Sequence, residues 1–397
     1  MRILPPVTAI AVLALAAAAA NAQQTGQSAG NSSAANSGSA IGNQSGTTGA
    51  AQGAAAWVEP GKPGSEIDGQ NFHAQVLMSA HGFSPGVIDG KEGESFKLAL
   101  RSFQEARGLQ RTGKLDTATR RALLAANRPS TVMVKLGPDD VSSNYVFPFP
   151  ANPEAQAELK FLGYRNMLEK VAERYHTTPA TIVALNGPDK MIGTGHTLRL
   201  PNVSTTSTEY GDASSQGASV MRLLNIEAQQ PEGNYVVVDK SEGVLKVYRG
   251  TPPEGTAGAA PKDSAKTDAD GEGSATGQDG AGQLVAAFPV TMGSKEYPLP
   301  IGRWKATTYA FLPPFKYQPA ILNNPKTDKE LTLPPGPNGP VGVAWLDLTK
   351  EHYGIHGTNE PQTIGRAESS GCIRMTNWDV IRLSRMLKPG FTAIFQA

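Results

Sequence analysis

The chain has a single cysteine, Cys372, and it follows the histidine His356 by sixteen residues. A glycine precedes the thiol, and Arg374 follows it by two positions. A thiol becomes a strong nucleophile only as a thiolate, and a neighbouring imidazole can remove its proton. Arg374 and a following helix would add positive potential, so we expect a lowered thiol pKa. Backbone N–H groups at Gly371 and Cys372 could bind an oxyanion, which predicts acyl transfer.

A metal site is the competing interpretation, because His352 and His356 are four residues apart. On a helix that spacing would align two ligands. Here Gly354 and the apolar alternation around it predict a strand, and no glutamate follows His352. The sequence therefore predicts neither a metal site nor a cofactor, and we expect His352 to pack beside the site.

The region that must position these groups starts at Gly233, where the pattern changes to strands. Residues 234–250 alternate around a Ser-Glu-Gly turn and predict a β-hairpin, and residues 284–293 would continue the sheet. The intervening residues 251–282 have no periodicity and predict a disordered insert without a phosphate-binding motif. We expect this insert to contribute little to packing.

The chain after Cys372 predicts a capped helix and a final strand. Thr376 or Asn377 can cap a helix that runs through Leu387. Pro389-Gly390 stops that helix, and the segment FTAIF closes the domain as a strand.

The first 22 residues predict a signal peptide. Arg2 is followed by an apolar run from Val7 to Ala20, and Ala20-Asn21-Ala22 is a cleavage site of the A-x-A type. The run is short for a membrane span, which makes an uncleaved anchor the weaker alternative. We therefore expect export to the periplasm or cell envelope, and a mature chain from Gln23 without a membrane span.

Export bears on the lone thiol. One cysteine cannot form an internal disulfide, so Cys372 pairs between molecules, is an inert buried thiol, or is a nucleophile. An idle thiol in an oxidising compartment is exposed to oxidation, which favours the nucleophile. The formal net charge of +1 also argues against a nucleic-acid binder that works through a strong positive field.

Residues 66–127 predict a small domain of three helices. Apolar residues on one face mark the first two helices, and Asp116 is a suitable N-cap for the third. The stretches GFSPGVIDG, FQEARGL and TGKLDTATRRAL resemble the three-helix peptidoglycan-binding module. This resemblance implies binding of wall glycan or stem peptides. A helical spacer without a ligand is the alternative.

Residues 161–203 predict two helices and a short strand. Thr178 and Pro179 form an N-cap and N1 pair for the second helix. The stretches AERYHTTPATIVALN and GHTLRLPN resemble the second half of a LysM module, whose usual first strand is not clear in this sequence. His176 and His196 are assigned to packing here, without a chemical role.

The C-terminal stretch HGTNEPQTIGRAESSGCIRMTNWDVIRL resembles the signature of YkuD-family L,D-transpeptidases, in which a His-Gly pair precedes Ser-x-Gly-Cys-x-Arg. Upstream, PLPIGRWKATTY, FLPPFKYQPAIL and LPPGPNGPVGVAWLDL also resemble that family. The resemblance covers residues 233–397 apart from the insert. It implies a mainly-β catalytic domain, a β-sandwich with short helices.

The predicted protein is thus multidomain, with a three-helix domain and a small α+β segment before the catalytic domain. In chain order the predicted segments are a signal peptide (1–22), a disordered linker (23–65), the peptidoglycan-binding-like domain (66–127), a linker (128–160), the LysM-like segment (161–203), a linker (204–232) and the L,D-transpeptidase domain (233–397) with its insert (251–282).

The resemblance also implies a role for each matching residue. Cys372 would be the nucleophile, and His356 its base and later the acid. The backbone carbonyl of Gly357 would orient His356. The N–H groups of Gly371 and Cys372 would form the oxyanion hole, and Arg374 would fix the loop or the substrate's charge.

One position departs from the commonest form of the family. Ser370 stands where many members have histidine. Its hydroxyl is expected to make a local hydrogen bond, or simply to fill the loop.

The implied reaction acts on peptidoglycan stem peptides. Cys372 would attack the third residue of a tetrapeptide stem, release D-alanine and form a thioester. A stem amine would then give a 3–3 cross-link, water would give L,D-carboxypeptidase activity, and a protein amine would attach an envelope protein to the wall. Carbapenems are implied as inhibitors. A non-catalytic wall-binding protein with an inactive transferase domain is the competing class.

Overall fold

The computed structural model describes residues 59–60, 62, 65–204, 210, 215–254, 282–294, 297–322, 324–366 and 371–397. All of them belong to one unit, Ala55–Ala397. The predicted signal peptide, nearly all of the 23–65 linker, residues 255–281 of the insert, and Ser370 lie outside the described residues.

The helices predicted for residues 66–127 are present. They are α1 (Gly69–Ala80), α2 (Glu94–Ala106), α3 (Thr117–Leu123) and the short η1 (Leu124–Ala126). The Asp116 side chain accepts the N–H of Thr119, which confirms the predicted cap of α3. Phe96, Leu100 and Phe103 of α2 are fully buried, and their cluster continues into residues of the β-sheet described below.

A second group of elements surrounds a two-stranded sheet. It comprises β1 (Thr131–Lys135), α4 (Pro138–Val141), α5 (Pro153–Ala157), α6 (Met167–Arg174), α7 (Pro179–Asn186) and β2 (Thr197–Pro201). Thr178 caps α7 and Pro179 follows it, as predicted. β1 and β2 pair antiparallel, from Thr131 opposite Pro201 to Lys135 opposite Thr197.

Two segments expected to be linkers carry ordered elements instead. Residues 128–160 contain β1, α4 and α5, and residues 204–232 contain α8 (Gln216–Leu223). β1 is stabilised by pairing with β2, more than sixty residues later in the chain, and local composition does not reveal such a partner. Ser215 caps α8 by accepting the N–H of Ala218.

The remaining strands build the C-terminal region, residues 233–397. They are β3 (Tyr235–Asp239), β4 (Val244–Arg249), β5 (Gln283–Pro289), β6 (Thr291–Met292), β7 (Gly302–Phe311), β8 (Phe315–Tyr317), β9 (Leu331–Leu333), β10 (Ala344–Leu348), β11 (Gly354–His356), β12 (Ile373–Arg374) and β13 (Thr392–Gln396). Two short 3-10 helices, η2 (Pro319–Ile321) and η3 (Pro361–Thr363), lie in the loops.

Within the described ranges, nine of these strands form one sheet in the order β5-β4-β3-β13-β7-β10-β11-β12-β6. The predicted β3–β4 hairpin is confirmed, and β5 continues the sheet beside β4. Most neighbouring strands are antiparallel, but β13 runs parallel to β3, and β12 runs parallel to β11. The expected mainly-β architecture is confirmed, and these nine strands are joined in one continuous sheet. β8 and β9 form a separate hairpin that packs near α5.

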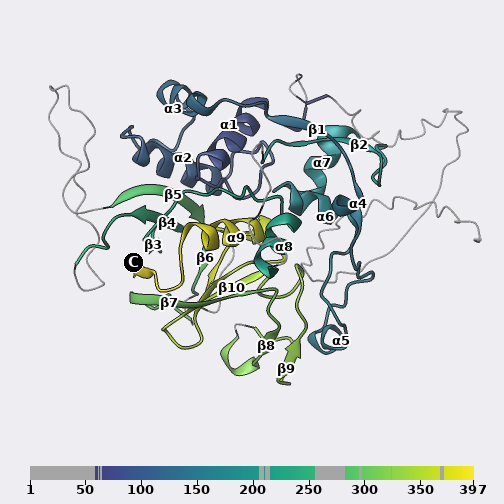
Figure 1. The fold of residues 1–397 in the computed structure, drawn as a ribbon, viewed down its shortest axis with the longest axis vertical. Coiled ribbons are helices and arrows are strands. Elements are labelled where there is room, and N and C mark those ends of the chain that lie inside the picture. Colours follow the sequence, from purple (N-terminus) through teal and green to yellow (C-terminus); the bar gives the residue numbers. More distant parts are fainter. Residues whose placement is uncertain are drawn as a thin grey trace, which may run out of the picture. The chain divides into compact units, whose positions relative to one another are not determined.

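The helix α9 (Asn377–Met386) lies between the two arms of this sheet, with β3–β5 on one side and β7 and β10 on the other (Figure 1). Thr376 is its N-cap, and nearly every residue of the helix is buried. Val380, Ile381 and Leu383 join the main hydrophobic core together with residues of both arms. Burial of all faces explains why this short helix forms despite its polar residues.

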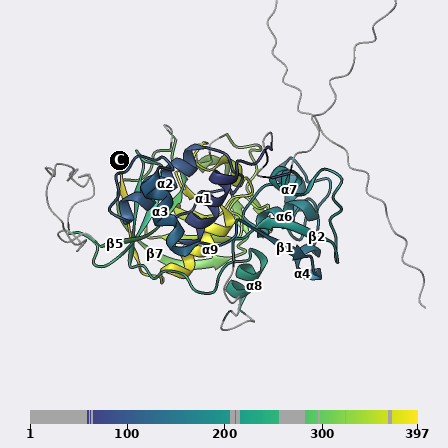
Figure 2. The same cartoon turned by 90° about the horizontal axis from the view of Figure 1, so that it is seen from above.

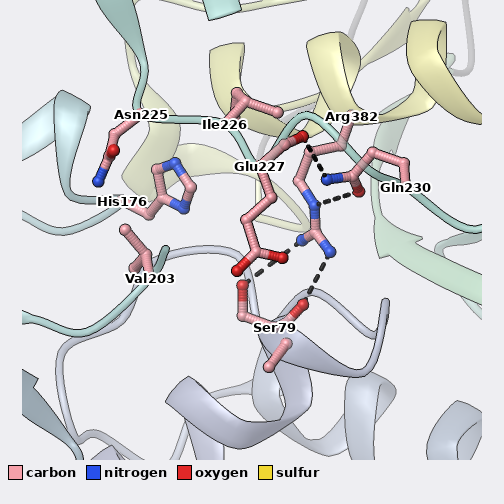
Figure 3. A pocket seen from close by; sticks show the side chains of 9 residues that line it. Ser79, His176, Val203, Asn225, Ile226, Glu227, Gln230 and Arg382 are labelled. Atoms are coloured by element: carbon pink, nitrogen blue, oxygen red, sulfur yellow. Dashed lines mark hydrogen bonds between the residues drawn. The ribbon is translucent and has the colours of Figure 1, made fainter. Parts of the chain in front are cut away.

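The three-helix domain packs directly on this C-terminal region, and α1 and α2 lie over the sheet in both views (Figures 1 and 2). Ser84 Oγ donates to the buried carboxylate of Asp379 at 2.7 Å. The Arg382 guanidinium donates to the backbone carbonyl of Ser79 at 2.7 Å and reaches Gln230 at 3.3 Å (Figure 3). These polar contacts place residues 65–127 firmly on α9.

The region around α6 is fixed to the same helix. His176 is buried, its ring stacks on Trp378 of α9, and its Nε2 contacts the carbonyl of Leu224 at 2.9 Å. Burial lowers the pKa of His176 to about 3, so its imidazole is neutral. His176 therefore lies in packing, as the sequence predicted.

None of the helices in the described ranges is long and apolar enough to cross a bilayer.

Candidate active site

The parallel pair β11–β12 brings the histidine and the cysteine segments together. Ile355 pairs with Ile373, and His356 pairs with Arg374. By this register Cys372 lies beside Gly354. Because side chains alternate across a strand, Ile355 and Ile373 enter the hydrophobic core, while the opposite face carries His356, Arg374 and Cys372. By this register Cys372 and His356 lie on the same face of two neighbouring strands, two positions apart.

Trp345 of β10 covers this face from the other side. It pairs with His356 across the antiparallel β10–β11 ladder, and the two rings stack with centroids 5.3 Å apart. Its indole Nε1 donates to Asp347 at 3.1 Å. A Cβ at position 354 would lie 2.4 Å from the indole ring. Gly354 is thus the residue that admits Trp345 beside the imidazole.

The imidazole of His356 is held by the next residue. Its Nδ1 lies 2.7 Å from the carbonyl oxygen of Gly357, and a carbonyl only accepts hydrogen bonds. Nδ1 therefore carries the proton, and Nε2 keeps a lone pair that can accept one. Burial, with a smaller effect from Arg374, lowers the pKa of His356 to about 3, so the ring is neutral near pH 7.

The thiol of Cys372 is half-buried, and its Sγ lies 3.6 Å from the backbone carbonyl of His352. Burial raises the thiol pKa above its ordinary value, while a hydrogen bond from the backbone of Gly354 and the charge of Arg374 act in the opposite direction. The expected lowering of the pKa is therefore wrong. β12 separates Cys372 from the first turn of α9 in the chain. Desolvation of the thiol raises its pKa by more than the positive charge of Arg374 lowers it.

Gly371 makes the turn before Cys372. Its φ is +100°, which side-chain-bearing residues rarely adopt. A Cβ on Gly371 would lie 2.6 Å from the ring of Tyr353. Tyr353 also lies close to Cys372, whose charge raises the tyrosine pKa after the larger effect of burial. The turn therefore brings the backbone of residues 371–372 against an aromatic wall.

Arg374 is half-buried next to His356. Its Nε is buried and has no hydrogen-bond partner among the residues that the structure describes. Burial lowers the arginine pKa, and the charges of Glu360 and Cys372 act to raise it. The guanidinium remains positive, because an arginine titrates far above neutrality.

The histidine pair considered as metal ligands does not converge. His352 is in a turn with φ +65°, its side chain is mostly exposed, and it lies 3.5 Å from the carboxylate of Glu351. His356 points from the buried strand β11. The strand prediction is confirmed. Over the described ranges, no cluster of three His, Cys, Asp or Glu residues has metal-site geometry.

The structure brings Cys372, His356, Gly357, Gly371 and Arg374 to neighbouring positions on β11, β12 and their loops. Ser370 lies outside the described residues. Sequence reasoning missed Trp345, Tyr353 and Asn377 as parts of the site. The alternation in AWLDL indicated a strand, but nothing in it indicated that Trp345 faces the histidine.

Comparison with known proteins is most informative for the region that contains these residues. Residues 279–395 match the family YkuD, described as “L,D-transpeptidase catalytic domain”. This part of the chain is similar to an L,D-transpeptidase catalytic domain. Residues 73–123 match PG_binding_1, described as “Putative peptidoglycan binding domain”. These matches confirm the resemblances to YkuD-family L,D-transpeptidases and to the peptidoglycan-binding module, and the LysM-like resemblance stays a prediction. The range matched by YkuD includes both Cys372 and His356.

Individual relatives match over short stretches. “Putative L,D-transpeptidase YkuD” of Bacillus licheniformis is 57% identical over 56 residues, which is 14% of this chain and 34% of that protein. The chain thus spans about a third of the length of the curated relatives that it matches.

Two solved structures show more distant similarity. L,D-transpeptidase 3 from Mycobacterium tuberculosis, in complex with a faropenem-derived adduct, is 17% identical, with a TM-score of 0.27, over 42% of this chain and 60% of that one. The L,D-transpeptidase from Xylanimonas cellulosilytica is 12% identical, with a TM-score of 0.32, over 86% of this chain and 98% of that one.

Proposed function

We propose that this protein is an exported L,D-transpeptidase that forms 3–3 cross-links between peptidoglycan stem peptides. The observation that carries the proposal is the common face of Cys372, His356 and Arg374 inside the matched L,D-transpeptidase domain. A nucleophile, a base with a free lone pair and a fixed positive charge are the parts that acyl transfer needs.

The first half-reaction releases D-alanine. Sγ of Cys372 attacks the carbonyl carbon of the third stem residue, a diamino acid, while Nε2 of His356 takes the thiol proton. Since thiol and imidazole are both neutral at rest, this proton transfer accompanies the attack. The N–H groups of Gly371 and Cys372 stabilise the oxyanion. The bond to D-alanine then breaks, its nitrogen receives the proton from His356, and a thioester remains.

The second half-reaction transfers the acyl group. The side-chain amine of another stem attacks the thioester carbonyl, and His356 takes the amine proton. The carbon–sulfur bond breaks, and the sulfur leaves with the proton returned from His356. Arg374, with a buried Nε–H that no described residue accepts, is suited to a substrate carboxylate. Water in place of the amine would make the enzyme an L,D-carboxypeptidase, and a protein amine would attach an envelope protein.

The other modules support action on the wall. A cleft of about 670 Å³ lies between the three-helix domain, α6–α7 and the loop that follows His356. Asp89 and Lys91 line it on one side, and Gln362 and Arg366 on the other. Its size suits an oligopeptide or disaccharide, and its walls carry both signs of charge, as stem peptides do. We infer that the wall polymer is held there, beside the catalytic loop.

We also infer that residues 161–203, together with β1, are a degenerate LysM-like segment. The helices α6 and α7 precede β2, which pairs antiparallel with β1, and this supports the assignment, although α4 and α5 also lie between β1 and α6 in the chain. The apolar run before Ala22 supports export to the periplasm or cell envelope.

A defined reaction tests the proposal. The mature protein and its Cys372→Ala variant would be incubated with purified tetrapeptide muropeptides, and the products identified by mass spectrometry. The unaltered protein should release D-alanine and form 3–3 dimers, and the variant should do neither while it melts at a similar temperature. Dimers formed by the variant would refute the mechanism.

The same reaction, with a parallel incubation with a carbapenem, separates the alternatives. Tripeptide monomers as the sole product would indicate a carboxypeptidase. A protein that binds muropeptides, forms no product and gains no mass from a carbapenem would be a non-catalytic wall binder.

A further inference from the structure

A buried carboxylic acid from outside the catalytic domain contacts the active-site region. Glu173 is on α6, and its Oε1 accepts a hydrogen bond from Nδ2 of Asn377 at 2.6 Å. Both side chains are buried, Asn377 completely. Residue 173 lies outside both ranges that match a known family. No role in catalysis follows for it from the sequence.

Asn377 is in turn locked against the loop that holds the catalytic histidine. Its Oδ1 accepts the N–H of Val343 at 3.1 Å, and its Nδ2 also donates to the carbonyl of Pro337 at 3.2 Å. A Cβ on Gly357 would lie only 2.1 Å from this Oδ1, and one on Gly342 only 1.9 Å. The amide therefore fills the space that two glycines leave open.

The orientation of that amide has one solution. Val343 offers a donor, whereas Glu173 and Pro337 offer acceptors, so oxygen and nitrogen cannot exchange places without losing these bonds. The carboxyl of Glu173 accepts the shortest of these three hydrogen bonds, 2.6 Å, and so helps to determine which end of Asn377 rests on Gly357. The carbonyl of Gly357 then receives Nδ1–H of His356 at 2.7 Å.

We propose that Glu173 and Asn377 are positioning residues for His356. Through Glu173, the helix α6, which lies outside the catalytic domain, holds Asn377 against Gly357. The carbonyl of Gly357 then fixes the Nδ1–H tautomer of His356, which leaves Nε2 free as the base. The α6 region then contributes a positioning residue to the active site in addition to packing against it. This inference rests on the proposed function for its kinetic consequence, but its structural core concerns His356 alone.

The direct test reads the tautomer and needs no turnover. Ring-¹⁵N-histidine NMR on the full mature chain distinguishes Nδ1–H from Nε2–H imidazole, and loss of a signal in His356→Asn assigns it. The unaltered protein should show Nδ1–H at His356, and Glu173→Ala should show a mixture of tautomers. Unchanged Nδ1–H in Glu173→Ala would overturn the proposal.

Kinetics provide the second readout. Misplacing a catalytic base by a fraction of an ångström to an ångström can cost on the order of 10- to 100-fold in rate. Glu173→Ala should lower kcat by this factor with KM within about 2-fold. Glu173→Gln should recover most of kcat, because its Oε1 can still accept from Asn377. A loss confined to KM, or one that Gln does not rescue, would count against positioning.

Glu169 provides the matched control. It lies one turn earlier on α6, and its carboxylate contacts Arg165 and Asn338 instead of Asn377. Glu169→Gln should leave the tautomer unchanged and kcat within about 2-fold. Equal losses in both variants would indicate general damage to α6 and refute the specific link. If the unaltered protein has no turnover at all, the proposed function fails, while the tautomer test still decides this inference.

Discussion

Replacement of Gly357 by alanine should disable the active site through one steric contact. The added Cβ would lie 2.1 Å from Oδ1 of Asn377, whereas real Cβ atoms essentially never approach closer than 3.0 Å. The two must therefore separate by about 0.9 Å or more. Asn377 has little freedom to move, because its amide bonds Val343, Pro337 and Glu173. Most of the displacement falls on Gly357 and its carbonyl.

The size of the effect follows from what that carbonyl does. At 2.7 Å it holds Nδ1–H of His356, and a shift near 1 Å breaks this bond or rotates the ring. Loss of orientation on this scale costs on the order of 100-fold in rate. Overpacking in a buried site adds about 1–3 kcal/mol of destabilisation, which leaves the variant measurable at moderate temperature.

The assay is acylation of Cys372 by a carbapenem, followed over time by intact-protein mass spectrometry. Gly357→Ala should slow this reaction by the factor above, while circular dichroism shows a folded chain. An acylation rate within about 2-fold of that of the unaltered protein would refute the reasoning, because the carbonyl of Gly357 would then not control the orientation of His356.

A double variant sharpens the test. Asn377→Ala removes the clashing oxygen, so Gly357→Ala in that background should cause little additional loss. Additive losses in the two variants would show that the Cβ and the amide do not meet.

Two further predictions follow from the pKa values. The pKa of His356 is about 3, and the pKa of Cys372 lies above its ordinary value. The rate of carbapenem acylation should therefore be constant within about 2-fold from about pH 4.5 to 8. An inflection of that rate near about pH 6.5, the ordinary histidine pKa, would contradict this prediction. Burial raises the pKa of Glu173 from 4.5 to about 7, so the folded state binds this proton more tightly and the stabilisation is lost as pH rises through 7. Relative to Glu173→Gln, the unaltered protein should lose on the order of 3 kcal/mol of unfolding free energy between about pH 4.5 and 8, measured by urea titration. If the unfolding free energies of the two proteins change with pH in the same way, this burial effect is excluded.

The sequence predicted local elements well, because local signals specify them. The caps Asp116 and Thr178, the β3–β4 hairpin and the helix after Thr376 all depend on residues a few positions apart. β1 was missed because its partner β2 is distant in the chain. The match to a peptidoglycan-binding domain and an L,D-transpeptidase domain was foreseen from motifs, whereas their close packing on α9 was not.

The candidate site divides in the same way. The segments with His356 and Cys372 were found because their residue types and spacing are distinctive. The direction of the thiol pKa was wrong, because the degree of desolvation depends on the tertiary arrangement of Tyr353, Gly354 and β12. Asn377 looked like a possible helix cap in the sequence, and its role against Gly357 arises only where α6, α9 and the catalytic loop meet.

The position of β13 has a consequence for how the enzyme is assembled. This strand, the last in chain order, inserts between β3 and β7, and Gln396 bonds Asp239 across a sequence separation of 157 residues. Until it docks, no strand pairing within the described ranges joins the arm with β3–β5 to the arm with the His356 and Cys372 strands. Pairing over such a separation is intrinsically slow, since a long loop must close first. The two arms of the sheet are therefore joined late, after the strands that carry His356 and Cys372 have been synthesised.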